Sequence, residues 1–297
     1  MKKILCLGLL ITILGGCNSK ISSSSSSLKV ESVSSVVTST SSSSSSTIIS
    51  ESEVSSSTTI SSSIISSSSS SSSSSTSIST GYLESDWYSG EYYNEVDFSL
   101  EDNALFLELR NLISTTHTNL ITYGDLRYDT IAKADASLED SSKIVMIYSR
   151  KELSSTWDNG TTWNREHVWP QSVGWWGKAS NSSKSAGSDL HHVRPETPSV
   201  NSSRGNKAFG TKSGQYLPVD EAKGDVARIL FYMLTRYSET DSKSITVVAE
   251  SMDLLLEWNE LDPVDALEKQ RNDVGEDIQG NRNPFIDYPE LADVIWG

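Results

Sequence analysis

The amino-acid sequence predicts an α+β fold: a single, mainly helical domain around a small sheet, preceded by a disordered Ser-rich linker. Three observations support this prediction. Residues 18–81 consist largely of Ser and Thr, aromatic and charged residues appear together from Tyr82 onward, and helix-length apolar patterns then outnumber short strand-like runs. The remaining stretch of about 215 residues is long enough for one domain with its own core.

The first 17 residues look like an export signal. Lys2 and Lys3 precede an apolar run at residues 4–14, which is too short to cross a bilayer comfortably. The run ends before Cys17 in a sequence that resembles a bacterial lipobox. We therefore expect residues 1–16 to be a lipoprotein signal peptide and Cys17 to carry lipid, at the extracellular face of the cell membrane. An ordinary secretion signal cut nearby, or an uncleaved anchor, is the alternative.

Residues 17–81 are expected to be a lipid-anchored, disordered tether. Before Gly81 they contain no aromatic residue, proline or glycine, so they cannot bury enough apolar surface to offset the entropy of ordering. Cys6 would leave with the signal and Cys17 would be lipidated. The domain expected at residues 82–297 therefore has no cysteine for a disulfide and depends on its core for stability.

Local patterns predict the elements of this domain in order. Residues 99–102 (Ser-Leu-Glu-Asp) suggest a capping box that opens a helix with apolar residues at Leu105, Leu109, Leu112 and Ile113. Residues 144–148 form a short apolar run that predicts a buried strand. Residues 158–160 (Asp-Asn-Gly) then predict a turn.

Two further helices are predicted in the C-terminal part. Beyond Gly224, one apolar helix face is formed by Val226, Leu230, Met233, Leu234 and Tyr237. The next helix is expected to begin at Asp262 and Pro263 and to end at Gly280. We interpret both apolar stripes as core.

Two polar blocks carry the functional signal. They lie at residues 164–170 (Asn-Arg-Glu-His-Val-Trp-Pro) and 189–195 (Asp-Leu-His-His-Val-Arg-Pro), and the second leads into residues 201–207. They contain three of the four histidines, together with carboxylates, a carboxamide and several arginines. These residue types suit metal-assisted hydrolysis of a phosphodiester, which requires a base, oxygen ligands and cations that bind the anion.

The polar blocks resemble the endonuclease I family of secreted bacterial nucleases, built on the ββα-metal (His-Me finger) motif. Residues 224–237 resemble the central helix of that family, and residues 258–287 resemble its C-terminal signature. The resemblance covers most of residues 82–297. It implies that the first block forms one strand, the second block forms another, and residues 199–207 begin a helix.

The resemblance also implies roles for individual residues. His167 matches the general base, and Glu166 and Asn201 match the ligands of one divalent cation. Carboxylate and carboxamide oxygens suit a hard cation, Mg²⁺ first, with Ca²⁺ or Mn²⁺ as alternatives. A neutral imidazole can accept a proton from water near pH 7. Asn201 has a second interpretation, as a helix N-cap.

The remaining candidate residues surround this set. Asp189 and His191 are expected to support the ligands indirectly, and the candidate contacts to phosphate are Arg165, Arg194, Arg204 and Lys207. The phosphate-stabilising arginine that the family has between its two strands has no clear counterpart here. Only Lys178 and Lys184 are basic in that loop, and lysine lacks the bidentate fork of arginine.

Adjacent side chains of a regular strand point to opposite faces, so Glu166 and His167 could not both face one substrate there. We therefore expect the chain to leave ideal strand geometry at this point, helped by Pro170.

The formal net charge of −15 is unusual for a protein that binds nucleic acid. Residues 161–212, however, contain seven basic and three acidic residues, so this region has a local charge of +4. Screening over about 8 Å at physiological salt allows such a region to act despite distant acidic residues. We expect modest, salt-dependent binding with little sequence preference.

The sequence thus predicts a tethered, metal-dependent endonuclease acting on DNA, with RNA open as a further substrate, that leaves 5′-phosphate ends. A monomer with no protein partner is expected. The alternative is a surface lipoprotein that binds nucleic acid without catalysis, which the intact Glu166, His167 and Asn201 argue against. Another type of metallohydrolase is disfavoured because the chain has no His-Glu-x-x-His motif.

Overall fold

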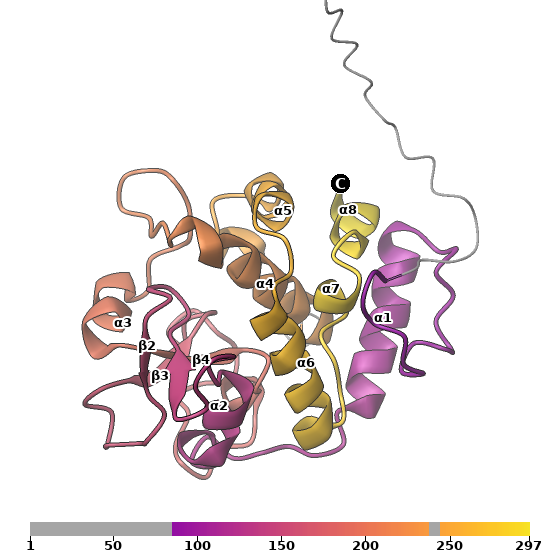
Figure 1. Ribbon diagram of the computed structural model, residues 1–297. Coiled ribbons are helices and arrows are strands. Elements are labelled where there is room, and N and C mark those ends of the chain that lie inside the picture. The colour runs from indigo at the N-terminus through magenta and orange to yellow at the C-terminus, as the bar shows by residue number, and fades with distance from the viewer. Residues whose placement is uncertain (1–84, 238–243) are drawn as a thin grey trace, which may run out of the picture. The chain divides into compact units, whose positions relative to one another are not determined.

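The computed structural model describes residues 85–237 and 244–297, and Figure 1 shows how their elements are arranged. The predicted signal peptide, Cys17 and the tether lie outside these residues. The helices and strands are α1 (Asp102–Thr116), α2 (Asp129–Ala134), β1 (Lys143–Val145), β2 (Glu152–Ser154), β3 (Asn164–His167), β4 (Val193–Glu196), α3 (Pro198–Arg204), α4 (Lys223–Tyr237), α5 (Met252–Leu261), α6 (Ala266–Gln279), α7 (Pro284–Asp287) and α8 (Leu291–Trp296). Short 3₁₀ turns lie at Asp125–Arg127 (η1), Ala186–Ser188 (η2), Asp220–Ala222 (η3) and Ile245–Val247 (η5).

The fold is α+β, as predicted. Within the described residues, the strands form two separate antiparallel pairs, β1 with β2 and β3 with β4. The predicted strand at residues 144–148 is shorter than expected, because β1 ends at Val145 and the chain turns while remaining buried. The backbone N–H of Ile147 in this turn donates to the carbonyl of Pro195, which links the first hairpin to β4.

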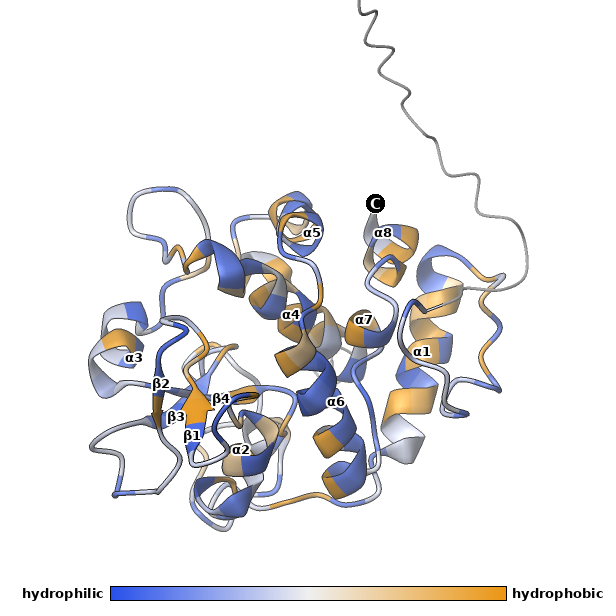
Figure 2. Ribbon diagram, viewed as in Figure 1, coloured by the Kyte–Doolittle hydropathy of each residue, from blue (hydrophilic) through white to orange (hydrophobic). Residues whose placement is uncertain are grey.

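Helix α1 has the predicted apolar face but a different start. Leu105, Leu109 and Ile113 are fully buried, and Figure 2 shows apolar and polar residues alternating along α1. The predicted capping box is wrong: the helix begins at Asp102, and the hydroxyl of Ser99 donates to Asp97. Tertiary packing of the apolar face is therefore what defines this helix.

Helix α4 lies at the centre of the larger core, in contact with α1, α5 and α7 (Figure 1). The sequence suggested one apolar face, but the structure buries every residue from Gly224 to Thr235, Asp225 and Arg228 included. A helix buried on all sides needs partners for its charged residues, which a single-face pattern does not reveal.

The C-terminal helix α6 starts later than predicted. Its N-cap is Asp265, which forms a capping box with Glu268, whereas the carboxylate of Asp262 accepts a hydrogen bond from the backbone N–H of Gly224 at the start of α4. Gly280 ends the helix in the left-handed conformation, φ 89°, as predicted.

None of the helices in the described ranges has the length and apolar character to span a membrane.

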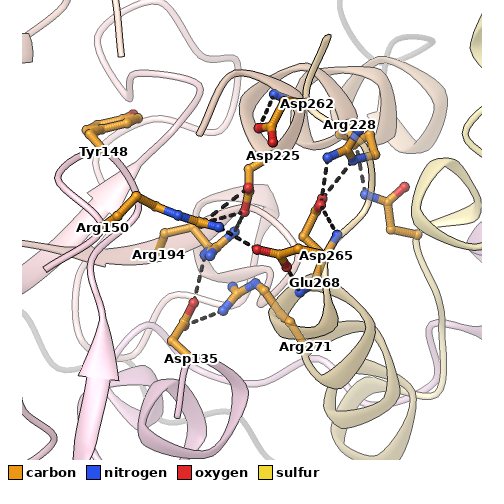
Figure 3. Close-up of polar contacts among 12 residues, drawn as sticks. Asp135, Tyr148, Arg150, Arg194, Asp225, Arg228, Asp262, Asp265, Glu268 and Arg271 are labelled. Carbon is orange, nitrogen blue, oxygen red and sulfur yellow. Dashed lines mark hydrogen bonds and ion pairs between the residues drawn. The ribbon is translucent and has the colours of Figure 1, made fainter. Parts of the chain in front are cut away.

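A buried network of charged residues joins the strands to the helices (Figure 3). Arg194 of β4 donates to Asp135, which follows α2, at 2.7 Å, and to Asp225 of α4 at 3.2 Å. Arg228 of α4 forms two hydrogen bonds with Glu268 of α6, at 2.7 and 2.6 Å. Removing one member would leave an uncompensated buried charge, so the network holds β4 in a fixed place against α4.

Candidate active site

The two polar blocks form a ββα unit, in the order that the resemblance implied. β3 pairs with β4 so that Asn164 lies opposite Glu196 and His167 lies opposite Val193. Helix α3 follows directly, with Pro198 in its first turn, and packs against β3. The unit therefore joins residues that are more than 30 positions apart in the sequence.

A cavity of about 330 Å³ opens between β3 and α3. Glu166, His167 and Asn201 all line it, together with Arg165 and Arg204. Glu166 and His167 are neighbours in sequence, and both line the same cavity, with His167 as the last residue of β3. The predicted departure of the chain from ideal strand geometry at this point stays a prediction.

Glu166 is held by two side-chain donors on one oxygen. Its Oε1 accepts from the hydroxyl of Tyr148 at 2.8 Å and from Nη1 of Arg204 at 3.1 Å. The residue is 3% exposed. Burial raises the pKa of the Glu166 carboxyl to about 7, and the nearby Arg204 and the Tyr148 hydroxyl offset only part of that rise. Oε2 is thereby left as the oxygen available to a ligand.

His167 is fixed at both ring nitrogens. Nε2 lies 2.8 Å from the carbonyl of Gly187, and Nδ1 lies 3.1 Å from the side-chain nitrogen of Gln171. The ring stacks on Tyr123, with centroids 5.2 Å apart. Burial, and then repulsion from His192 and nearby arginines, lowers the pKa of His167 to about 3. The ring is therefore neutral at pH 7, the form in which one of its nitrogens carries a lone pair.

Asn201 lies within α3, whose N-cap is Thr197, so the N-cap interpretation of Asn201 is wrong. Its Nδ2 donates to Oδ1 of Asn164 at 2.7 Å. This hydrogen bond uses the nitrogen of the Asn201 amide, so Oδ1 is the atom that remains to bind a cation.

The four basic residues expected to contact phosphate have different environments. Arg165 lines the cavity, donates to the carbonyl of Tyr123, and its guanidinium lies 3.5 Å from the centre of the Tyr123 ring. Among the residues described, no carboxylate forms an ion pair with Arg165, and burial lowers its pKa. Arg204 lines the cavity but donates to Glu166 and to the carbonyl of His167. Arg165 is thus the cavity arginine that remains open to an anion.

Arg194 and Lys207 are not placed at the cavity. Arg194 is 1% exposed and its guanidinium is held by Asp135 and Asp225, so we do not assign it a phosphate contact. Lys207 is exposed beyond α3 and donates to the carbonyl of Ser203. Surface position allows Lys207 to meet a longer nucleic acid, but it does not touch the residues of the cavity.

Asp189 and His191 belong to a separate buried network. Asp189 accepts from the hydroxyls of Tyr232 and Tyr237, at 2.6 and 2.8 Å. Nε2 of His191 lies 2.9 Å from the carbonyl of Asn281. These contacts anchor the start of the second polar block to α4 and to the chain after α6, so the two residues support β4 and do not contact Glu166 or Asn201 in the hydrogen bonds of the described chain.

Sequence reasoning missed three residues of the site: Tyr123, Tyr148 and Gln171. Tyr148 orients Glu166, Tyr123 stacks on His167, and Gln171 reaches the His167 ring. Gln171 had the clearest signal, since it follows the first polar block by one position. Nothing local marked the other two, because their partners are 18 and 44 residues away.

The donor set of the cavity fits a hard, hydrated cation. Glu166 Oε2 and Asn201 Oδ1 are two oxygen donors in one cavity, and a carboxyl with a pKa near 7 is the form expected of a buried ligand without its cation. No group of three or more His, Cys, Asp or Glu side chains that could hold a metal occurs in the described part of the chain. Two protein ligands leave several positions to water, as Mg²⁺ prefers.

A ββα unit that gathers a carboxylate, an imidazole and a carboxamide beside an open arginine is a site of the nuclease class. The sequence comparisons identify the family. The Endonuclease I family model matches residues 102–217 and 211–290, and the chain belongs to this family, which confirms the resemblance noted in the sequence.

Curated relatives agree with this assignment. The chain is 38% identical over 232 residues to an extracellular ribonuclease of Bacillus amyloliquefaciens and 35% identical to one of Bacillus subtilis (strain 168); each alignment covers 69% of this chain and 78% of the relative. It is also 27% identical over 120 residues to endonuclease-1 of Buchnera aphidicola subsp. Acyrthosiphon pisum, covering 33% of this chain and 44% of that protein.

Proposed function

We propose that this protein is a metal-dependent endonuclease that hydrolyses phosphodiester bonds of DNA and RNA with little sequence preference, leaving 5′-phosphate ends. One observation carries the proposal: Glu166, His167 and Asn201 line a single cavity of the ββα unit. The only acidic residue among those that line the cavity is Glu166, whereas Arg165 and Arg204 are basic. A phosphodiester would therefore meet positive charge locally, despite the net charge of −15.

Glu166 and Asn201 would hold the divalent cation, which we propose to be Mg²⁺. When bound, the cation supplies positive charge that stabilises the charge developing on the phosphoryl and leaving oxygens. The chain contributes the ligand orientation, because Tyr148 and Arg204 hold Oε1 of Glu166, and Asn164 holds the amide of Asn201.

His167 would act as the general base on water. The carbonyl of Gly187 accepts from Nε2–H, so Nδ1 carries the lone pair that takes the proton as the water oxygen attacks phosphorus. The incoming phosphodiester brings negative charge, which opposes the lowering of the His167 pKa by burial. Arg165, which has an open guanidinium, would bind a phosphoryl oxygen.

RNA belongs in the proposed substrate range because two relatives whose alignments cover most of this domain are named extracellular ribonucleases. The experiment is a nicking assay on supercoiled plasmid and on a defined RNA, with and without EDTA, for the wild-type chain and His167→Ala. We expect EDTA to abolish cleavage and His167→Ala to lower turnover by roughly 10²–10⁴-fold. Binding of both nucleic acids without cleavage would favour the inactive surface lipoprotein instead.

We also propose export and attachment to the outer face of the cell membrane through lipid on Cys17. The two Bacillus relatives are named extracellular ribonucleases, and the lipobox-like sequence before Cys17 supports lipidation. Wild-type protein should partition into a detergent phase and incorporate labelled palmitate, whereas Cys17→Ala should do neither. A wild-type protein recovered only in the aqueous phase would contradict anchoring.

A further inference from the structure

The side chain of Gln171 bridges the His167 ring and the loop that joins β3 to β4. Its Nε2 lies 3.1 Å from Nδ1 of His167, and its Oε1 accepts from the backbone N–H of Ala179 at 2.7 Å. Gln171 is partly exposed and lines the cavity. It is thus the side chain that meets the proton-accepting nitrogen of the proposed base.

The hydrogen-bond partners settle the orientation of both groups. A backbone N–H can only donate, so Gln171 must present its oxygen to Ala179 and its NH₂ to the ring. The NH₂ group can only donate, so Nδ1 of His167 must accept. The carbonyl of Gly187 can only accept, so the ring proton is on Nε2. The two ends of the ring therefore select the same tautomer.

This geometry points to Gln171 as the residue that orients the attacking water on His167. A water that enters between the two side chains would accept a hydrogen bond from Nε2 of Gln171 and donate one to Nδ1 of His167. One lone pair and one O–H of that water are then fixed, and its second lone pair is free to attack phosphorus. The Gln171 side chain needs to move by about the width of one water molecule.

The inference rests on the proposed function and adds a nucleophile-positioning residue to it. In the step, the water oxygen forms a bond to phosphorus while its O–H proton passes to Nδ1 of His167. The bond from phosphorus to the 3′ oxygen breaks, its electron pair stays on that oxygen, and solvent supplies the proton for the new hydroxyl. Because the proposed role of Gln171 is to hold the nucleophile, its loss should lower turnover more than substrate affinity.

The test compares Gln171→Met and Gln171→Ala with the wild-type chain on a short DNA duplex. Ser183→Ala is the matched control, because the Ser183 hydroxyl accepts from the backbone of Ser180 in the same loop and does not touch Gln171. We expect Gln171→Met to lower kcat by roughly 10–100-fold with KM within twofold of wild type. Ser183→Ala should keep the kcat and KM of the wild-type protein. Thermal unfolding should show that all variants are folded.

A second measurement reports the nucleophile itself. In dilute methanol, attack by the alcohol leaves a 5′-phosphate methyl ester, which mass spectrometry separates from the 5′-phosphate formed by water. Gln171→Ala opens space beside Nδ1, so the ester should form a several-fold larger fraction of its product than in wild type. This fraction does not depend on how much of the variant is folded.

The outcomes are separable. An active wild-type protein whose Gln171→Met variant keeps its kcat, or whose Gln171→Ala variant gives an unchanged ester fraction, would overturn this inference and leave the proposed function standing. A folded wild-type protein that cleaves neither DNA nor RNA would overturn both.

Discussion

The hydrogen bond from Tyr148 to Glu166 should determine how tightly the site binds its cation. The phenol is 1% exposed, so in Tyr148→Phe no water can replace the lost hydroxyl at Oε1. A hydrogen bond to a charged group contributes about 1.5–3 kcal/mol, and a tenfold change in affinity corresponds to about 1.4 kcal/mol. We expect cation affinity to fall by roughly 10–100-fold, as for other residues that orient metal ligands.

Two effects of the substitution act in the same direction. Arg204 would remain as the only side-chain donor to Oε1, so Glu166 would be less well oriented. The Tyr148 hydroxyl also lowers the pKa of Glu166, so its removal would raise that pKa above the present value of about 7. A proton would then compete more strongly with the cation.

The assay titrates Mn²⁺ into the protein without nucleic acid and measures binding by calorimetry or electron paramagnetic resonance. Tyr216→Phe is the matched control, because its ring packs 5.2 Å from the ring of Tyr148 and the same atom is deleted. A folded Tyr148→Phe variant that binds Mn²⁺ within twofold of wild type would refute the positioning argument. Equal weakening in Tyr216→Phe would show that the aromatic cluster, and not the hydrogen bond, is responsible.

Three further predictions follow from the charged residues. Arg194→Met should lower the free energy of unfolding by about 3–5 kcal/mol in urea, because it leaves Asp135 and Asp225 buried without their partner; an unchanged midpoint would contradict this. Burial raises the pKa of Asp189, but His117 and several hydrogen bonds outweigh burial and hold it well below its usual value. The unfolded chain therefore binds more protons, and the contribution of Asp189 is present at neutral pH and lost as the pH falls below about 4. In Asp189→Asn, the free energy of unfolding measured in urea should therefore fall less between pH 6 and pH 3 than it does in the wild-type protein. Arg165→Gln should reduce the slope of log affinity against log salt for DNA by about one, while the exposed loop variant Lys178→Gln should reduce it less.

The ββα unit could be predicted because the motifs that carry the family resemblance are contiguous in the sequence. β3 (Asn164–His167) lies in the first polar block, β4 (Val193–Glu196) begins in the second, and α3 follows it directly, in the order that the family resemblance implied. Asn159 and Gly160 adopt positive φ in the turn before β3, as an Asn-Gly pair favours. The residues proposed for the cation and the base all lie in these segments.

The role of Arg194 could not be predicted in the same way. An arginine inside a polar block looks like a surface cation, but its partners Asp135 and Asp225 are 59 and 31 positions away. The predicted starts of α1 and α6 were wrong for a related reason. Asp262 has the residue type and spacing of an N-cap, yet tertiary contact directs its carboxylate to Gly224 of another helix. A local sequence pattern does not show which of several possible partners, near or distant in the sequence, a side chain will bind in the folded protein.

The orientation of Glu166 depends on a chain of contacts that begins at the other strand. Glu196, at the end of β4, is fully buried and accepts hydrogen bonds from the backbone N–H groups of Tyr148 and Ser149, at 2.8 and 3.1 Å. It also accepts from the backbone N–H of Thr197, the N-cap of α3, at 2.7 Å. One carboxylate thus positions both the tyrosine that orients Glu166 and the start of the helix that carries Asn201. Because β4 is held against α4 by Arg194, the two proposed cation ligands share a single rigid support, which is what a preorganised site requires.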